Sequence, residues 1–255
     1  MMIPMAESPT RSSPVHDLLG HLHPRWGALD GMPVPLTFGG RTVEQEQGLA
    51  RTLALCDASA LQRLVIKGPS AASFLGARGV APALPADLFH VLPLSSGGLI
   101  ARTGRAEFFL EDAPGEDGRQ DVVAPLGESL HNSPEPGVYP ALRQDASFLL
   151  SGDRASAVFL ETCGHDFRRS SPSPGQARVM VMTRVAGVST WVLHRTLNGN
   201  SVYQLWADGT YGPYLWETLL MIAREHGGDA VGLSGFFPGL EAGRAAQQLQ
   251  GHDRS

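Results

Sequence analysis

One sequence pattern occurs twice in the chain, as LVIKGPSAASFL (64–75) and as FLLSGDRASAVFL (148–160). In both copies an apolar run ends in a glycine, Gly68 or Gly152, and an alanine follows three residues later, Ala71 or Ala155. Glycine permits a tight turn that a Cβ would obstruct. The small alanine lets the first turn of a helix pack closely on a sheet. The pattern therefore predicts two strand–glycine–helix units of related fold, an internal repeat.

The segments around the two copies predict further strands and helices. GLIARTGRAEFFLED (98–112) and ARVMVMTRVAGVSTWVLHRT (177–196) each have two strand-like runs around a turn, which predicts two hairpins. A strand in SVYQLWA and a helix in PYLWETLLMIAREHGG follow. Upstream, we expect a short helix in VHDLLGHLHPRWG, an extended segment in GMPVPLTFGGRT and a helix in EQEQGLARTLALCD. This order, without a continuous βαβ rhythm, indicates an α+β fold.

The repeat and the linker between its copies suggest one two-lobed domain over residues 15–253. We expect its lobes at about 43–112 and 138–250, joined by a mobile Gly/Pro/acid-rich linker at 113–137. Residues 1–14 are rich in Ser, Pro and Thr and predict a disordered leader. This leader has no apolar core, so it is not expected to be a signal peptide.

The bulk composition argues against several classes of protein. The formal net charge is −5, and Lys67 is the one lysine, so no basic run is present to bind nucleic acid. No stretch reaches the roughly 18 apolar residues of a membrane span, so we expect a cytoplasmic protein. Cys163, His165 and Asp166 lie too close together to converge on one metal ion. We expect a turn there and no metal site.

Four segments in order resemble the glycine-cleavage T-protein superfamily of folate-binding aminomethyltransferases. They are LCDASALQRLVIKGPSAASFL, DASFLLSGDRASAVFL, HRTLNGNSVYQLWA and ETLLMIAREHGGDAVGLSGFFPGLEAG. The resemblance implies a central cavity between two lobes that holds tetrahydrofolate. Carried over position by position, it implies the lining residues Arg102, Arg195, Asn198, Asn200, Tyr203, Gln204 and Glu241.

The sequence departs from that family where the family does its chemistry. Ala101 and Arg102 stand where the family places carboxylates, and Asn200 and Gln204 replace glutamates. An alanine or arginine cannot act as a general base, and an amide lacks a carboxylate's charge-assisted hydrogen bonds. We expect Arg102 to reverse the local charge and to hold an acidic group. The C-terminal barrel of the family is expected to be missing, and no catalytic residue is assigned.

The gamma subunit of heterotetrameric sarcosine oxidase resembles the chain more closely in form, through RTLNGNSVYQLWADGTYGPYLWETL. This resemblance implies a non-catalytic protein of one-carbon metabolism, with a flavoprotein oxidase subunit or a second copy of the chain as partner. The alternative is an active folate-dependent aminomethyltransferase with displaced catalytic groups. A folate-binding iron–sulfur assembly factor ranks third, because its K-G-C-Y-x-G-Q motif is not found. Four aromatic residues predict either core packing or a stacking and partner surface, namely Trp206, Tyr211, Tyr214 and Trp216.

Overall fold

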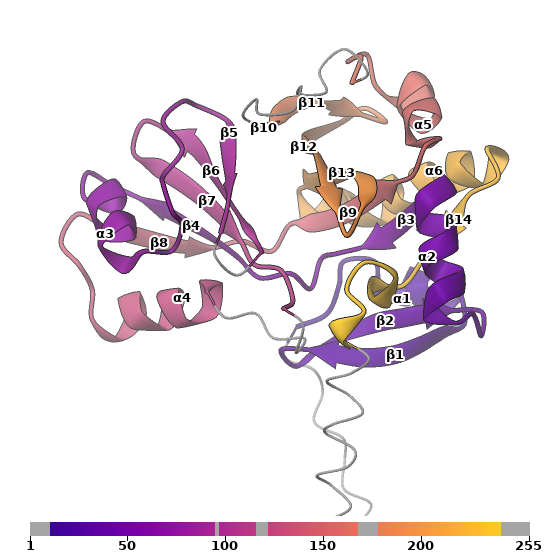
Figure 1. Ribbon diagram of the computed structural model, residues 1–255, viewed down its shortest axis with the longest axis horizontal. Coiled ribbons are helices and arrows are strands. Elements are labelled where there is room, and N and C mark those ends of the chain that lie inside the picture. The colour runs from indigo at the N-terminus through magenta and orange to yellow at the C-terminus, as the bar shows by residue number, and fades with distance from the viewer. Residues whose placement is uncertain (1–10, 95–96, 116–121, 168–177, 241–255) are drawn as a thin grey trace, which may run out of the picture.

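A computed structural model describes residues 11–94, 97–115, 122–167 and 178–240. Two six-stranded sheets form the body of the protein (Figure 1). In spatial order, the first sheet contains β10 (Arg178–Val179), β5 (His90–Pro93), β6 (Leu99–Gly104), β7 (Glu107–Glu111), β4 (Arg63–Lys67) and β8 (Tyr139–Leu142). The second contains β11 (Val181–Val185), β12 (Val188–Leu197), β13 (Asn200–Ala207), β9 (Ala146–Ser151), β3 (Ala54–Asp57) and β14 (Asp229–Ala230). Both sheets are open, so the described residues form no closed barrel.

Helices and a two-stranded hairpin surround the sheets. The hairpin pairs β1 (Pro24–Leu29) with β2 (Met32–Phe38). The helices are α1 (His16–Gly20), α2 (Val43–Thr52), α3 (Ala71–Arg78), α4 (Val123–Asn132), α5 (Ala155–Thr162) and α6 (Gly212–Glu225). Two short 3-10 helices are η1 (Gly209–Tyr211) and η2 (Leu233–Gly235). The α+β class expected from the sequence is confirmed.

The two strand–glycine–helix units have the same local geometry. β4 leads through Gly68 into α3, and β9 leads through Gly152 into α5. Both glycines have a positive φ, +120° at Gly68 and +99° at Gly152, which L side chains rarely adopt. A Cβ on Gly152 would lie 2.4 Å from the backbone carbonyl carbon of Thr52. Ala71 and Ala155 are fully buried, as expected for alanines that seat a helix on a sheet.

The two halves of the chain are interleaved in the sheets. β3, which precedes the first unit in sequence, lies in the second sheet between β9 and β14. β10, from the second half, closes the edge of the first sheet against β5. The segment 113–137 contains α4, which composition did not predict. Its Val123, Leu126 and Leu130 are buried in the core of the first sheet.

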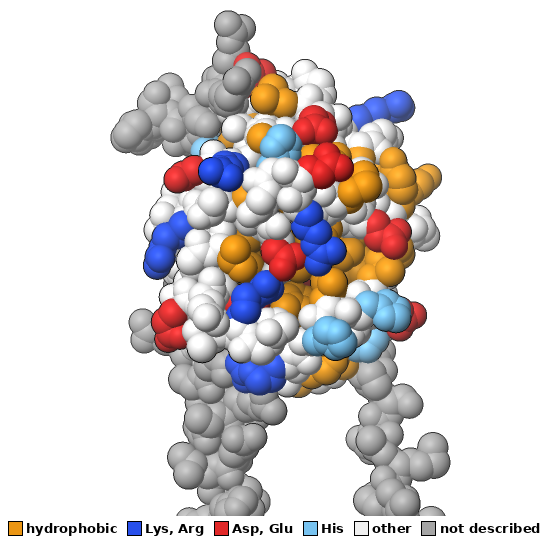
Figure 2. Space-filling model, turned by 90° about the vertical axis from the view of Figure 1, so that its right-hand side faces the viewer, with side chains coloured by type: hydrophobic (Ala, Val, Ile, Leu, Met, Phe, Trp, Pro, Cys, Tyr) orange, Lys and Arg blue, Asp and Glu red, His pale blue; other side chains and the backbone are white. Residues whose placement is uncertain are grey.

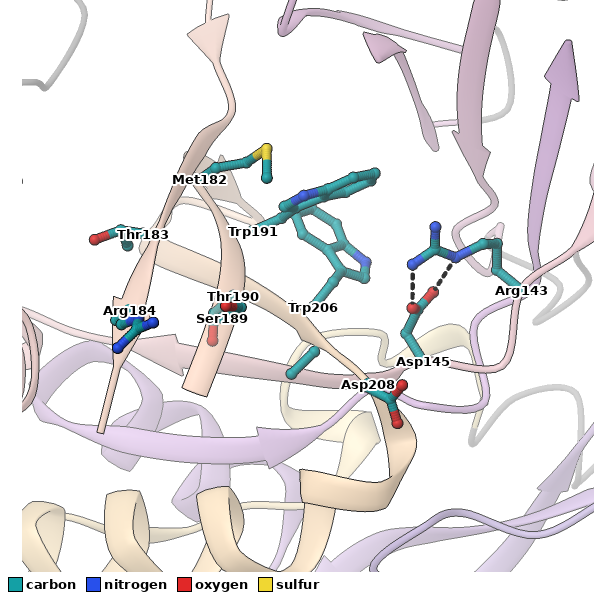
Figure 3. A pocket seen from close by; sticks show the side chains of 11 residues that line it. Arg143, Asp145, Met182, Thr183, Arg184, Ser189, Thr190, Trp191, Trp206 and Asp208 are labelled. Carbon is teal, nitrogen blue, oxygen red and sulfur yellow. Dashed lines mark hydrogen bonds and ion pairs between the residues drawn. The ribbon is translucent and has the colours of Figure 1, made fainter. Parts of the chain in front are cut away.

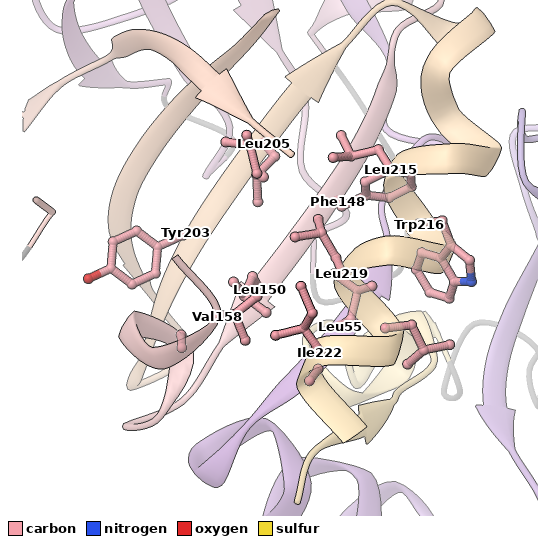
Figure 4. Close-up of a cluster of buried hydrophobic side chains, with 14 of the residues drawn as sticks. Leu55, Phe148, Leu150, Val158, Tyr203, Leu205, Leu215, Trp216, Leu219 and Ile222 are labelled. Carbon is pink, nitrogen blue, oxygen red and sulfur yellow. The ribbon is translucent and has the colours of Figure 1, made fainter. Parts of the chain in front are cut away.

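The outer face of the second sheet carries the largest apolar core (Figure 4). Strand residues such as Phe148 and Leu205 pack there against Leu215, Leu219 and Ile222 of α6. The apolar stripe of α6 follows helical spacing, so one face of the helix is buried. Burial of each such side chain contributes about 1.5–3 kcal/mol to stability. This core covers one face of the second sheet, and residues on the other face, such as Trp206, pack against the first sheet.

Among the described residues, no helix combines the length and the apolar character that crossing a membrane requires.

Replacing Gly152 by alanine is expected to lower the free energy of unfolding by about 2 kcal/mol or more, because it adds both strain at positive φ and a backbone clash. Gly127→Ala is the matched control: a Cβ at this α4 position meets no atom within 4 Å. That change should raise stability by about 0.5–1 kcal/mol through helix propensity. Urea unfolding of both variants measures the difference. Equal effects would contradict the tight turn at Gly152.

Candidate functional site between the two sheets

The inner faces of the two sheets meet in a cluster of buried polar side chains. Alternate residues of β12 and β13 point to this face, among them Arg195, Gln204 and Trp206. From the first sheet, Arg63 at the start of β4 and Glu111 at the end of β7 lie opposite each other in antiparallel register. All five side chains are at most 7% exposed. The cluster is therefore a charged site inside the protein.

Glu111 is the centre of this cluster. Its Oε1 accepts a hydrogen bond of 2.5 Å from Gln204 Nε2, and its Oε2 accepts one of 2.6 Å from Trp206 Nε1. Arg63 Nη1 lies 3.7 Å from Oε2. Burial raises the pKa of Glu111, while attraction to Arg63 and Arg195 acts in the opposite direction. Glu111 thus joins the two sheets through hydrogen bonds from one sheet to a carboxylate on the other.

Several buried polar atoms of the same region have no hydrogen-bond partner in the part of the chain that the structure describes. They are Nε and Nη1 of Arg63, Nε and Nη2 of Arg195, Oε1 of Gln204, and Oγ of Ser147 and Ser151. Ser147 and Ser151 belong to the same inner face, because they pair with Trp206 and Val202 across β9 and β13. A buried polar atom without a partner is costly. The cluster therefore has spare capacity for a water or a ligand.

Of the seven residues expected to line a cofactor site, the structure brings Arg195 and Gln204 together in this cluster. Tyr203 points to the outer face of β13, where it stacks on His194 with ring centroids 4.4 Å apart. Strand periodicity explains this separation, because neighbouring residues of a strand point to opposite faces. Asn200 is buried at the start of β13. Glu241 lies outside the described residues.

Arg102 does not belong to the buried polar cluster between the two sheets. Its guanidinium donates to the carbonyls of Ala86, Gly104 and Arg105, so it ties together the loops beside β6. Ala101, the preceding residue, is fully buried among apolar side chains of both sheets. Backbone carbonyls thus occupy donors of Arg102, and its expected binding of an acidic group stays a prediction.

Asn198 has a structural task in the turn between β12 and β13. It adopts a positive φ of +48° before Gly199, as the tight two-residue hairpin requires. Its side-chain amide donates to the backbone carbonyl of Phe236, which holds the segment after β14 against the hairpin.

Sequence reasoning missed Glu111 and Arg63. Glu111 ends the apolar run EFFLE of β7, and Arg63 opens the run RLVIK of β4. A charge at the end of a predicted strand is ordinarily solvated. The signal that could have identified them is their pairing: the hairpin and the neighbouring strand place both charges at the same end of the first sheet.

An open groove of about 380 Å³ lies beside the cluster (Figure 3). Arg143 and Asp145 form a two-pronged ion pair at one side, with Nη2–Oδ1 at 2.5 Å and Nε–Oδ2 at 3.0 Å. The Arg143 guanidinium also lies 5.2 Å from the centroid of Trp191. Trp206 lines this groove and donates to Glu111, so its indole separates the groove from the buried cluster.

A second groove, of about 410 Å³, lies on the surface between α1 and α6. Apolar side chains line it, including Leu18 of α1, Leu22 just after that helix and Met221 of α6. Met221 is 57% exposed and Tyr214, on the same helix, is 51% exposed. Figure 2 views the molecule from the side on which α6 lies in Figure 1 and shows apolar side chains among charged and histidine side chains. Exposed apolar surface of this kind is typical of an interaction site.

The segment ETCGHDF forms no metal centre in the described residues, where no group of three His, Cys, Asp or Glu side chains converges. Cys163 Sγ lies 3.5 Å from Thr183 Oγ1 and accepts from the His165 amide at 3.4 Å. The backbone of Cys163 also bridges to Val185. These contacts are those of a turn that joins α5 to the second sheet.

Comparison with known proteins identifies relatives by structure. Neither protein-family models nor curated sequences match the chain. Among solved structures, the aminomethyltransferase T of the glycine cleavage system from Bartonella henselae is similar with a TM-score of 0.64 at 17% identity. The alignment covers 88% of this chain and 60% of that one. This chain therefore spans less than two thirds of the length of that enzyme.

A chain of the heterotetrameric sarcosine oxidase from Corynebacterium sp. U-96, in complex with pyrrole 2-carboxylate, is similar with a TM-score of 0.57 at 16% identity. Here the alignment covers 84% of this chain and 95% of the other. The resemblance inferred from four sequence segments is confirmed at the level of the fold: the structural neighbours are a glycine-cleavage aminomethyltransferase and a sarcosine oxidase chain.

Replacing Glu111 by alanine is expected to cost about 3–5 kcal/mol of stability, because it leaves two buried guanidinium groups without a counter-charge. Glu111→Gln keeps an acceptor for one donor and should cost less. Glu128→Ala, at an exposed position on α4, is the control and should change stability by less than about 0.5 kcal/mol. Chemical unfolding measures all three. A Glu111→Ala variant as stable as the control would refute the central role of this carboxylate.

Proposed function

We propose that this protein is a non-catalytic subunit of a heteromeric complex of the sarcosine oxidase type, acting in one-carbon metabolism beside a flavoprotein oxidase subunit. The observation that carries the proposal is that the carboxylate between the sheets, Glu111, is already engaged in hydrogen bonds. Ala101 is packed among apolar side chains, and the Gln204 amide is bonded to Glu111. Both oxygens of Glu111 accept hydrogen bonds, so this carboxylate is not free to act as a base.

One structural neighbour is a chain of a heterotetramer, which supports the proposal of a subunit that works with a partner. The apolar groove between α1 and α6 gives such a partner a surface to cover. Apolar side chains that are more than half exposed, such as Met221, gain stability when a partner removes them from water.

Tetrahydrofolate is the ligand that the fold resemblance implies, and the residues do not fit it in the way the family pattern requires. That pattern needs a carboxylate to accept hydrogen bonds from the pterin ring. The unpaired atoms between the sheets are mainly guanidinium donors, and the unpaired acceptor of Gln204 is a neutral amide oxygen. Arg102 and Tyr203 lie away from this cluster. We therefore assign tetrahydrofolate no catalytic step here.

Titration of the pure protein with tetrahydrofolate tests the absence of enzyme activity. Trp206 donates to Glu111, so its fluorescence should report a ligand that enters the cluster. We expect no saturable quenching at micromolar concentrations and no turnover of formaldehyde or methylamine. Trp206→Phe serves as the control that assigns any quenching to this position. Micromolar binding together with turnover would instead support an aminomethyltransferase with displaced catalytic groups.

Capture of a partner from cells that express the chain tests the subunit proposal. The co-purified partner should carry a flavin, detected by its absorbance of visible light. Met221→Glu places a charge in the α1–α6 groove and should abolish co-purification. Leu142→Glu, at a position 74% exposed on the edge strand β8, is the matched control and should leave capture unchanged. Capture of no flavoprotein by the unmodified chain would contradict the proposal.

A further inference from the structure

The buried cluster contains more positive than negative charge. Arg63 and Arg195 face one carboxylate, that of Glu111. The other charged groups around Arg63 are two arginines and two aspartates, so their charges cancel. They are Arg11, Arg143, Asp57 and Asp145. Arg178 adds a further positive charge near Arg195. Two buried guanidinium groups with one counter-ion leave the centre of the protein in need of an anion.

The buried polar atoms without a hydrogen bond are mainly donors, which agrees with the excess of positive charge. Both oxygens of Glu111 are taken by Gln204 and Trp206. Four guanidinium nitrogens make no hydrogen bond among the described residues, and one of them, Arg63 Nη1, has only the ion pair with Glu111 at 3.7 Å. The corresponding unpaired acceptor is one amide oxygen, that of Gln204. The hydroxyls of Ser147 and Ser151 can act in either direction. A ligand that forms hydrogen bonds with these unpaired atoms must therefore carry mainly hydrogen-bond acceptors.

The geometry of Arg195 is specific for one kind of acceptor. Its unpaired nitrogens are Nε and Nη2, which form one edge of the planar guanidinium. This edge presents two parallel N–H groups, the arrangement that matches the two oxygens of a carboxylate. Arg195 is 7% exposed, so such an ion pair would form out of bulk water, where it is strong.

We propose that Arg195, with Arg63 beside it, forms a binding site for a small monocarboxylate between the two sheets. The ligand's two oxygens accept from Nε and Nη2 of Arg195, and its charge balances the excess of the cluster. The groove beside Arg143 and Asp145 lies on the other side of the Trp206 indole. This site is independent of the partner subunit, and it takes an anion where the family pattern predicts acidic side chains.

Thermal unfolding with formate or acetate, in a buffer free of other carboxylates, tests the proposal. We expect the melting temperature to rise with the logarithm of ligand concentration above the Kd, and no comparable rise with chloride at equal ionic strength. Arg195→Met should remove this rise. Arg195→Lys, which retains the charge without the two-pronged edge, should weaken apparent affinity by about tenfold or more. Arg51→Met, an exposed arginine on α2, is the matched control and should retain it.

A measurement on the unmodified protein guards against variants that fail to fold. The NMR signal of the Arg195 Nε–H group should shift in a saturable way as formate is added. Wild-type protein that shows neither this shift nor the rise in melting temperature contains ordered water only, and the proposal is then overturned. An equal rise in Arg195→Met would also overturn it. Neither result depends on whether a flavoprotein partner is found.

Discussion

A carboxylate on one sheet holds the other sheet in place. Glu111 comes from β7, while the amide and indole that bind it come from β13. Because charged groups out of contact with water must be hydrogen-bonded, these two short bonds fix how closely the sheets approach. Apolar contacts lie beside these bonds, for example between Phe109 and Trp206, whose ring centroids are 5.6 Å apart. The groove at Arg143 and Asp145 is also a consequence, since Trp206 forms its inner wall.

The same interaction brings a carboxylate to the cluster from a strand that the family resemblance did not single out. The sequence has no carboxylate at 101, 102, 200 or 204, and Glu111 of β7 bonds to Gln204 of β13. The contact between the two sheets is therefore polar at this point, and its hydrogen bonds cross from one sheet to the other.

Local patterns in the sequence were sufficient to predict much of the fold. The glycines at 68 and 152 and the alanines three residues later predict the two strand–helix units, because backbone conformation and close packing are local properties. The spacing in α6 predicts its buried face. The exchange of β3 and β10 between sheets was not predicted, since pairing of distant strands leaves no local signal. The helix α4 was not predicted, because the segment around it has the Gly- and Pro-rich composition of a loop.

The site was less predictable than the fold for a related reason. Arg195 and Gln204 were identified through a resemblance, but Tyr203 and Arg102 lie elsewhere because strand periodicity sends adjacent residues to opposite faces. Glu111 and Arg63 belong to the first sheet, whereas Arg195 and Gln204 belong to the second. Local sequence patterns do not show which strands of the two sheets face each other. Asn198 was predicted as a ligand residue, yet its side chain stabilises a turn.

The parallel pairing of β14 with β3 affects the order in which the chain can fold. β3 begins at Ala54 and β14 at Asp229, so the edge of the second sheet joins segments made early and late in synthesis. During synthesis, β3 is made long before its neighbours β9 and β14, so it cannot pair until those strands follow. Contacts between such distant segments slow folding and lengthen the time for which unpaired strand edges are exposed. The edge of β3 is therefore exposed for longer during folding than the edge of a strand whose partners follow it directly in sequence.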